Sequence, residues 1–467
     1  MPGSGDVRRG TASRASASAL SILLALSSHV FGTAWAKTWT LTAGGDAVTQ
    51  MVASSDPATQ AVWDISRNST FSFFNMEGQL LDLNSFTGYP MSENGPGSEG
   101  YGGPVGGFAF DPAMGKLLAG AGFNIASQAN NHAWNFGIAG VEATQNALRA
   151  ANISFAGAGH NLTEARGAGF AERNGLRLGL VASTGTHQPE SLAMDAAPAK
   201  NYKARPGINV VRAPHVTVLD EADFAVIRKV AHLQGQTVAA NATDITLQVG
   251  QTFFEWGRFR QAKPGTEAPR IDWDLNTSDR TGIQDAVKQA LAAADTAIFS
   301  IHSHEPAAVL DNAESIVPFP AAASVPASYI GEISRAAIDA GADAAVVTGP
   351  RAPRGIEMYR GRPIFYGLGS LVFGWGIGSA NYTPPVEQDD SFLARVAYAD
   401  GRVTEVALYP LVHTQLTKAP VPEDAMPKMA PTAQAQRILG ILQRLSRPLG
   451  TNIVIRGDVG YVDLGAV

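Results

Sequence analysis

Short apolar runs alternate with segments of helical period along this chain, and this alternation most narrowly limits its fold. Strand-like runs are expected at residues 37–43, 70–75, 123–127, 176–182, 296–301, 342–347 and 363–366. Helical segments are expected at residues 111–121, 137–150, 220–233, 282–293, 329–340 and 431–445. Strands that alternate with helices are typical of layered folds in which helices cover buried sheets. The sequence therefore predicts the α/β class.

Composition excludes several classes of protein. The 467 residues are 45% hydrophobic, which is enough for one large core or two ordinary cores and excludes a disordered chain. No cysteine is present, so disulfides, thiolate metal sites and a cysteine nucleophile are excluded, and any metal must bind nitrogen and oxygen ligands. The net charge of −6 argues against a basic surface for nucleic acid. We therefore expect no nucleic-acid partner.

Residues 1–36 have the pattern of an export signal. Three arginines precede an uncharged stretch with its apolar centre at residues 19–26, and an Ala-x-Ala pattern follows at residues 34–36. We predict cleavage before Lys37 and a periplasmic or secreted mature protein that does not span the membrane. The alternative is a retained N-terminal membrane anchor, because the uncharged stretch is long enough to cross a bilayer.

The rest of the chain is expected to form one main domain with two additions. The main domain is predicted over residues 37–415. Steady periodicity is lost around residues 202–281, which we interpret as an insertion in that domain. A C-terminal helix and a hairpin-like segment, within residues 416–467, are expected to pack on the main domain.

Four polar clusters each follow a predicted strand. They are Asp46, Asn75 with Glu77, Asn130-Asn131-His132, and His302-Ser303-His304-Glu305. Clusters that are far apart in sequence can meet at the carboxyl ends of strands, where open α/β sheets bind ligands. Their oxygen and imidazole ligands suit Mn, Zn, Fe or Mg ions. Each cluster alone is explained as well by ordinary loop chemistry, but their conjunction favours one shared site.

Several of these blocks occur in an order that resembles a known family. The blocks are Gly45-Asp46, Asn75-Met76-Glu77, Ala-Asn-Asn-His-Ala-Trp-Asn-Phe-Gly at residues 129–137, and Gly-Arg-Pro-Ile-Phe-Tyr-Gly-Leu-Gly-Ser at residues 361–370. In this order they resemble the CapA family of capsule-synthesis proteins, also called poly-γ-glutamate biosynthesis proteins. The resemblance runs from about Leu41 to Phe373, and the Asn-Asn-His block is its most specific part.

The resemblance implies a fold and a set of site residues. It implies a calcineurin-like metallophosphoesterase fold, an α/β/β/α sandwich of two central sheets flanked by helices. By matching position, and with His304 as a replacement or supplement, the implied metal ligands are Asp46, Glu77, Asn131, His302 and His304. Catalytic roles are implied for Asn131 and for His132, the latter as a general acid outside the metal ligands or as a contact to an oxyanion.

This sequence departs from the family pattern at one place. Members usually carry Gly-His-x-Pro-His before Arg-Gly-Ile-Glu, whereas Thr348 and Arg351 stand at the two histidine positions here. A two-metal site needs enough ligands to hold ions roughly 3.5–4 Å apart, and a guanidinium offers no lone pair. We therefore expect one divalent ion (Mn, Zn, Fe or Mg) and doubt a second.

The missing histidines also allow one alternative to a single-ion site. In it the site binds no ion, and Arg351 with Arg354 pairs with a carboxylate or phosphate group. Against this anion role of Arg351 stands a packing role, in which Arg351 only covers a strand end, as surface arginines often do.

The resemblance also implies a biological process. It implies an exported protein of capsule or poly-γ-glutamate biosynthesis or processing, which acts on an anionic polymer or phosphoester and has polymer-synthase membrane proteins as partners. One alternative is a periplasmic metal-dependent hydrolase of phosphoesters or γ-linked polymer. The other is a non-catalytic polyanion-binding or assembly factor. Enzymatic activity is thus an open question at this level.

Overall fold

The structure is a computed structural model that describes residues 37–88, 109–249, 256–307, 321–373, 390–413 and 422–465. The export signal or anchor predicted for residues 1–36 lies outside these ranges and stays a prediction. Within them, no helix combines the length and apolar character needed to span a membrane. The helices are α1 (Pro57–Arg67), α2 (Met114–Gly120), α3 (Gly137–Ala150), α4 (Leu162–Arg166), α5 (Glu221–Leu233), α6 (Thr277–Ala293), α7 (Ser328–Asp339) and α8 (Thr432–Ser446).

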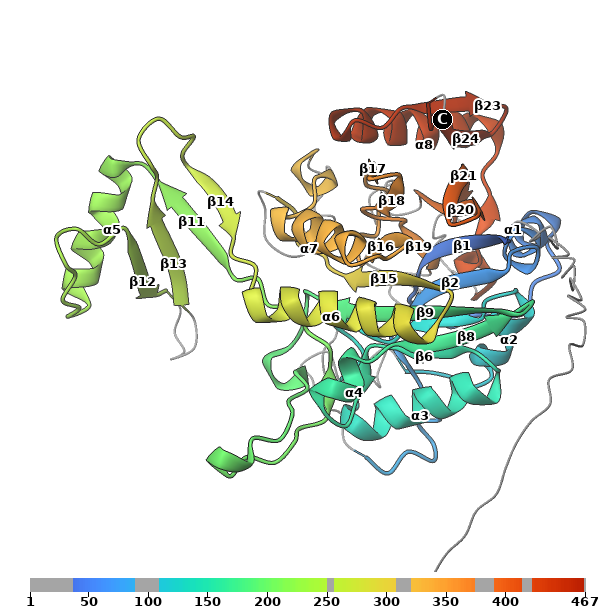
Figure 1. Ribbon diagram of the computed structural model, residues 1–467, viewed down its shortest axis with the longest axis horizontal. Helices are drawn as coiled ribbons and strands as arrows, with labels where there is room; N and C mark the ends of the chain where they lie inside the picture. Colours follow the sequence, from blue (N-terminus) through green and yellow to red (C-terminus); the bar gives the residue numbers. More distant parts are fainter. Residues whose placement is uncertain are drawn as a thin grey trace, which may run out of the picture. The chain divides into compact units, whose positions relative to one another are not determined.

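Two large sheets lie at the centre of the fold (Figure 1). The first sheet has the order β23-β24-β21-β20-β1-β2-β5-β6, with β19 paired to β1 and β22 to β21. Its strands are β1 (Thr38–Ala47), β2 (Phe71–Met76), β5 (Ile125–Ser127), β6 (Ser154–Ala156), β19 (Ser370–Val372), β20 (Asp390–Ala399), β21 (Arg402–Val412), β22 (Lys428–Met429), β23 (Ile453–Arg456) and β24 (Val459–Val462).

The second sheet has the order β17-β18-β16-β15-β9-β8. Its strands are β8 (Gly169–Arg173), β9 (Leu176–Thr184), β15 (Thr296–His302), β16 (Ala344–Thr348), β17 (Ile356–Tyr359) and β18 (Arg362–Phe365). Two short pairs complete the main domain: β3 (Gln79–Leu80) with β4 (Ala109–Phe110), and β7 (Ala158–Gly159) with β10 (Gly207–Ile208).

Side chains that alternate along the strands hold these layers together. Leu41 of β1 and Ile298 of β15 belong to one buried cluster, so the two sheets pack face to face. The opposite face of the first sheet contributes Phe74 to a second cluster with residues of α1, α2 and α3. The opposite face of the second sheet contributes Phe299 to a third cluster with residues of α6 and α7. The predicted α/β/β/α sandwich of two central sheets flanked by helices is confirmed.

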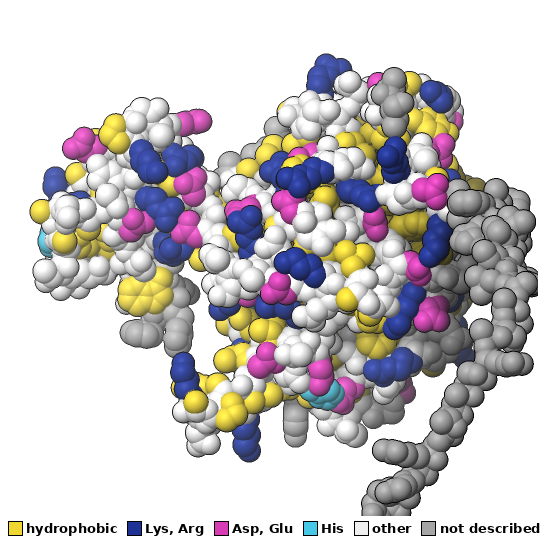
Figure 2. All heavy atoms as spheres, viewed as in Figure 1, with side chains coloured by type: hydrophobic (Ala, Val, Ile, Leu, Met, Phe, Trp, Pro, Cys, Tyr) yellow, Lys and Arg dark blue, Asp and Glu magenta, His cyan; other side chains and the backbone are white. Residues whose placement is uncertain are grey.

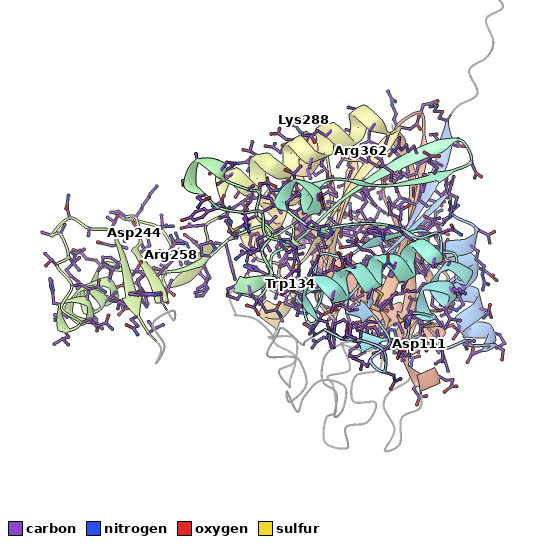
Figure 3. The ribbon with its side chains drawn as sticks, turned by 90° about the horizontal axis from the view of Figure 1, so that it is seen from below. Asp111, Trp134, Asp244, Arg258, Lys288 and Arg362 are labelled. Atoms are coloured by element: carbon purple, nitrogen blue, oxygen red, sulfur yellow. The ribbon has the colours of Figure 1, made fainter. Side chains whose placement is uncertain are left out.

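A separate four-stranded sheet occurs where regular periodicity is lost. This insertion sheet has the order β12-β13-β11-β14 and is built from β11 (His215–Leu219), β12 (Asp244–Gln248), β13 (Trp256–Gln261) and β14 (Arg270–Trp273). One small core joins it to α5, with Phe224 of the helix against Ile245 and Leu247. Asp244 and Arg258 lie on its strands (Figure 3).

Charges of both signs are interspersed on the face of the molecule drawn in Figure 2. On the insertion sheet, the Arg260 guanidinium lies 2.8 Å from Asp244 and 2.9 Å from Asp274. These partners raise the pKa of Arg260 through hydrogen bonds, so its charge is offset locally. An ion pair thus links β12 to β13, while the buried apolar residues of β11 and β12 alternate with more exposed ones.

The C-terminal helix and hairpin extend the first sheet. Strand β24 pairs with β21, and β23 pairs with β24 at the edge. Ile438, Leu439 and Leu442 of α8 are fully buried in the cluster that lies between the two sheets and continues beneath this helix. Helix α8 therefore packs through its apolar face.

A buried carboxylate fixes the start of α6. Asp279 is 2% exposed and accepts hydrogen bonds from Arg212 Nε (2.7 Å), Arg212 Nη2 (3.0 Å) and Arg166 Nη2 (3.1 Å). Burial by itself raises the pKa of Asp279, but the hydrogen bonds and charge of Arg212, with the charge of Arg166, outweigh burial and lower it. The ionised carboxylate therefore stabilises the folded state.

We expect Asp279→Asn to lower the unfolding free energy by about 2 kcal/mol at pH 7, the size of a charged hydrogen bond. The folded-state pKa lies below the ordinary value of 3.8, so this contribution is complete above about pH 5 and disappears as the pH falls through the folded-state pKa. Urea unfolding of both proteins at pH 7 and at pH 3 measures the difference. Asp285→Asn, at an exposed position of the same helix, is the control. An equal deficit at both pH values would contradict the expectation.

Candidate metal centre

The strands that carry the predicted polar clusters end at a common edge of the sandwich. In the first sheet β1, β2 and β5 are parallel, and Asp46 is in register with Asn75. In the second sheet β15 and β16 are parallel, and His302 is in register with Thr348. Because the two sheets pack face to face, the strand ends bring residues of all four clusters together.

Glu77 lies at the centre of this site. Its side chain is fully buried just after β2, and neither carboxylate oxygen has a hydrogen-bond partner in the described part of the chain. Three imidazoles approach the same oxygen: Nε2 lies 3.7 Å from Glu77 Oε1 in His304, 3.8 Å in His302 and 3.9 Å in His132. A buried carboxylate without donors and surrounded by imidazole nitrogens is the arrangement expected around a cation.

The spacing of these atoms fits a metal ion. Glu77, His302 and His304 each offer one ligand atom within 4.8 Å of the others. The Nε2 atoms of His302 and His304 are 3.2 Å apart. Ligands about 2.0–2.1 Å from a tetrahedral ion are about 3.4 Å from one another, close to the distances here. Asn131 Oδ1 lies 2.9 Å from His302 Nε2 and adds a neutral oxygen. This buried cluster could therefore bind a metal.

Asp46 contacts the other ring nitrogen of His302. Its Oδ1 accepts from Asn75 Nδ2 (2.7 Å) and lies 3.5 Å from His302 Nδ1, while its Oδ2 accepts from the Gly349 N–H (2.8 Å). Burial alone raises the pKa of Asp46, but His302, the Gly349 N–H and the Asn75 amide together lower it. Asp46 thus lies beside the histidine on the side away from Glu77. Its predicted role as a direct ligand stays a prediction.

The Asn-Asn-His block forms the turn between β5 and α3. Asn130 anchors the turn, because its Nδ2 donates to the Met76 carbonyl (2.7 Å) and its Oδ1 accepts from the His132 N–H (3.0 Å). Trp134, which follows in this block, lies beside the start of α3 (Figure 3) and is 6% exposed. The anchored turn directs Asn131 and His132 toward the imidazole cluster.

His132 is held neutral by its surroundings. Burial lowers its pKa well below 6.5, and the charges of Arg351, His304 and His302 lower it further. The Asn135 amide lies 3.2 Å from His132 Nδ1, and donation from this amide leaves the ring proton on Nε2. A neutral imidazole therefore presents an N–H group near Glu77.

Comparison with known proteins identifies the family. The chain matches the family described as bacterial capsule synthesis protein PGA_cap over residues 40–375. The chain belongs to this family. The resemblance to the CapA family, predicted from the ordered motifs, is thus confirmed.

The similar proteins are themselves sparsely described. Two proteins of Sinorhizobium fredii (strain NBRC 101917 / NGR234), the uncharacterized proteins y4sH and y4uA, are each 28% identical over 465 residues, which is 91% of this chain and 93% of theirs. Among solved structures, a hypothetical protein from Thermus thermophilus aligns at a TM-score of 0.33 and 12% identity, over 79% of this chain and 98% of its own. A structure described as a novel phosphatase from Mycoplasma pneumoniae aligns at a TM-score of 0.33 and 11% identity, over 81% of this chain and 94% of its own.

The end of β16 carries Thr348, and the turn after it leads to Arg351. The Thr348 hydroxyl lies 3.2 Å from His302 Nδ1, on the same side as Asp46. Arg351 is 3% exposed, and its charge reaches the site because it lowers the pKa of His132. Between them, Gly349 has a φ of +109°, and an added Cβ would lie 2.8 Å from the Ser303 backbone. This turn therefore brings a hydroxyl and a positive charge to the site, and their replacement of two metal-binding histidines stays a prediction.

Arg354 makes a different set of contacts. Its guanidinium donates to three backbone carbonyls: Ala323 (3.0 Å), His304 (3.2 Å) and Glu305 (3.5 Å). The anion-binding role predicted for Arg354 stays a prediction, and these contacts favour a structural role in which it holds the segment after β15. The anion-binding role of Arg351 likewise stays a prediction.

Some residues of the site carry no motif in the sequence. Thr186 Oγ1 accepts from the His304 N–H (2.9 Å) and donates to Glu305 Oε2 (2.9 Å). The Tyr329 hydroxyl also contacts Glu305 Oε2, at 3.0 Å, and Ser303 donates to the same oxygen. Glu305 therefore faces these hydroxyls rather than the cluster around Glu77. Thr186 and Tyr329 are distant from Glu305 in sequence and meet it only in the folded structure, so no sequence motif could have identified them.

Proposed function

We propose that this protein is an exported, metal-dependent hydrolase of a bacterial surface polymer, with one divalent cation held by Glu77, His302 and His304. The observation that carries the proposal is the fully buried Glu77 carboxylate, which has three imidazoles within 3.9 Å of one oxygen. An uncompensated buried carboxylate is destabilising by several kcal/mol, and a bound cation would compensate it. Membership of the capsule-synthesis family supports the polymer as substrate.

Each neighbouring residue has a role in this proposal. A cation in this position would supply Lewis-acid chemistry for hydrolysis. Asp46 orients His302 through Nδ1, as carboxylates beside ligating histidines do, and Thr186 fixes the His304 backbone. His132 donates its Nε2 proton to the oxygen that gains negative charge during the reaction. Arg351 stabilises negative charge on the substrate.

A second candidate function is a non-catalytic polyanion-binding factor. The observation that favours it is the pair Thr348 and Arg351, which stand where the family pattern has two histidines. A guanidinium binds carboxylates and phosphates but cannot ligate a cation.

Metal analysis combined with turnover separates these functions. We expect about one equivalent of metal per chain and metal-dependent hydrolysis of at least one member of a panel of poly-γ-glutamate, bacterial surface glycans and phosphodiesters. Two equivalents would contradict the single-ion site. No metal, with saturable polymer binding and no turnover, would establish the binding factor instead.

Arg351→His tests whether the charge of Arg351 prevents a second metal ion from binding. Restoring one imidazole should raise metal uptake above one equivalent, because a nitrogen lone pair replaces a positive charge. Arg444→His, at an exposed position of α8, is the comparison and should leave the metal content unchanged. If Arg351→His binds no more metal than the unaltered protein, the charge of Arg351 is not what excludes a second ion.

A further inference from the structure

A cavity of about 490 Å³ lies beside the candidate metal centre. Residues that line it and enter the argument are Thr186, His187, Arg212, His215, Trp273, Glu305 and Tyr329. They come from the segment after β9, from the segment before β11 and its first residue, from β14 of the insertion sheet, from the segment after β15 and from α7. The cavity is therefore formed where the insertion joins the second sheet.

The cavity and the metal centre share one wall. The Gly185 N–H donates to the His302 carbonyl (2.8 Å), and Thr186 bridges the His304 N–H and the Glu305 carboxylate. The segment that carries His302 and His304 thus also forms one side of the cavity. A polymer with one residue in the cavity would lie beside Glu77 and its histidines.

Aromatic rings give the cavity its character. The rings of Trp273 and Tyr329 are 5.6 Å apart between centroids and inclined at 44°, and His215 lies 5.7 Å from Trp273 on the neighbouring strand. The Trp273 N–H is buried, so it offers no donor to a ligand in the cavity. Aromatic rings with a few polar groups beside them, here Thr186, His187 and Glu305, are typical of ligand sites.

The charges of the lining disfavour an anionic ligand. Arg212 donates to Asp279 through Nε (2.7 Å) and Nη2 (3.0 Å), so its charge is offset. Burial, together with the charge of Arg258, lowers the pKa of His215, which leaves this ring uncharged near pH 7. Glu305 adds a carboxylate. The carboxylates of poly-γ-glutamate would meet repulsion here, whereas sugar hydroxyls would find an acceptor.

We infer that this cavity is a subsite for a neutral sugar residue of the polymer, stacked on Trp273 and hydrogen-bonded to Glu305 and His187. His187 Nδ1 lies 2.7 Å from the Gly185 carbonyl and donates to it, so its Nε2 is left as an acceptor. This inference deepens the proposed function, because it names a glycan as the substrate class where the family name suggests a polyglutamate.

Binding measurements test the subsite independently of hydrolysis. The probes are neutral hexasaccharides of glucose, galactose, mannose and N-acetylglucosamine, and hexa-γ-glutamate, titrated calorimetrically into the full-length protein after chelation of metal. We expect at least one hexasaccharide to bind. Trp273→Ala should weaken its binding at least tenfold, and Trp273→Phe, which keeps a smaller ring, should weaken it less. Trp256→Ala, at an exposed tryptophan of the same insertion sheet, should leave binding unchanged.

Three outcomes would overturn the inference: no hexasaccharide binds, Trp273→Ala and Trp273→Phe both bind as the unaltered protein does, or hexa-γ-glutamate is the probe that loses affinity in Trp273→Ala. Trp273→Phe keeps the test valid if Trp273→Ala does not fold. Because metal is absent throughout, failure here is distinguishable from failure of the metal centre, which the metal content measures.

Discussion

Glu77→Gln is expected to reduce the metal content of the purified protein from about one equivalent to nearly none, and to abolish metal-dependent turnover. The amide has the shape of the carboxylate but neither its charge nor its second acceptor oxygen, so the imidazoles of His302 and His304 lose their anionic partner. The loss of affinity should exceed the roughly 10–100-fold loss typical of a residue that only orients a ligand. Metal analysis and titration with Zn²⁺ or Mn²⁺ measure it.

Asp46→Asn provides the informative comparison. If Asp46 only orients His302, its loss should lower metal affinity by about 10–100-fold and leave a measurable site. Glu190→Gln, at an exposed position, is the control and should behave as the unaltered protein. In metal-free buffer, Glu77→Gln should unfold at a temperature no lower than the unaltered protein, because it removes a buried carboxylate without donors. Full metal occupancy in Glu77→Gln would contradict the proposed centre.

Arg437→Ala is expected to lower the unfolding free energy by about 2–3 kcal/mol, the upper range for hydrogen bonds to a charged group. Arg437 of α8 holds both oxygens of Asp390, at 2.6 Å each, and Asp390 is fully buried at the start of β20. Removing the guanidinium takes two charge-assisted hydrogen bonds from a buried carboxylate, in the layer that joins the C-terminal helix to the first sheet. Urea unfolding at pH 7 measures the loss.

Two further variants isolate the cause. Arg444→Ala removes an exposed arginine from the same helix and should change the free energy by less than about 0.5 kcal/mol. Replacing Asp390 by Asn in the Arg437→Ala background should recover part of the loss, because no buried charge then remains. If the double variant is no more stable than Arg437→Ala, the cost arises from lost packing instead.

The layered fold was predictable because its long helices and its central parallel strands obey a simple period. Helix α3 occupies the range expected from the apolar face of residues 137–150, and β15 differs by one residue from the run at 296–301. Strands buried on both faces give continuous apolar runs, and amphipathic helices give a clear stripe. The sandwich itself followed from the resemblance, since periodicity alone gives only the class.

Other elements were missed for identifiable reasons. Helix α1 is amphipathic but short, and the overlooked signal is Asp56, whose side chain accepts from the Ala58 N–H (2.7 Å), followed by Pro57 in the first turn. Strand β20 is buried on both faces in its first half and on one face in its second half, so no single period describes it. In the insertion sheet, β11 and β12 alternate buried apolar residues with more exposed ones but are only five residues long, whereas β13 and β14 carry paired charges and have no buried face.

The candidate site was predictable as a set of residues but not as an arrangement. The clusters could be found because each follows a strand. Sequence could not distinguish Glu77, at the centre of three imidazoles, from Asp46, beside the far nitrogen of His302, because that difference depends on side-chain direction. Nor could it find Thr186 or the carbonyl contacts of Arg354, which depend on where the chain returns after long loops.

The ligand atoms of the centre come from opposite halves of the molecule. Glu77 extends from the first sheet, whereas His302 and His304 extend from the second. An ion held between them would cross-link the two sheets, and the affinity of the site for this ion would depend on the distance between the sheets. Substitutions in the packed interface, far from any ligand, would therefore alter metal binding by changing that separation alone.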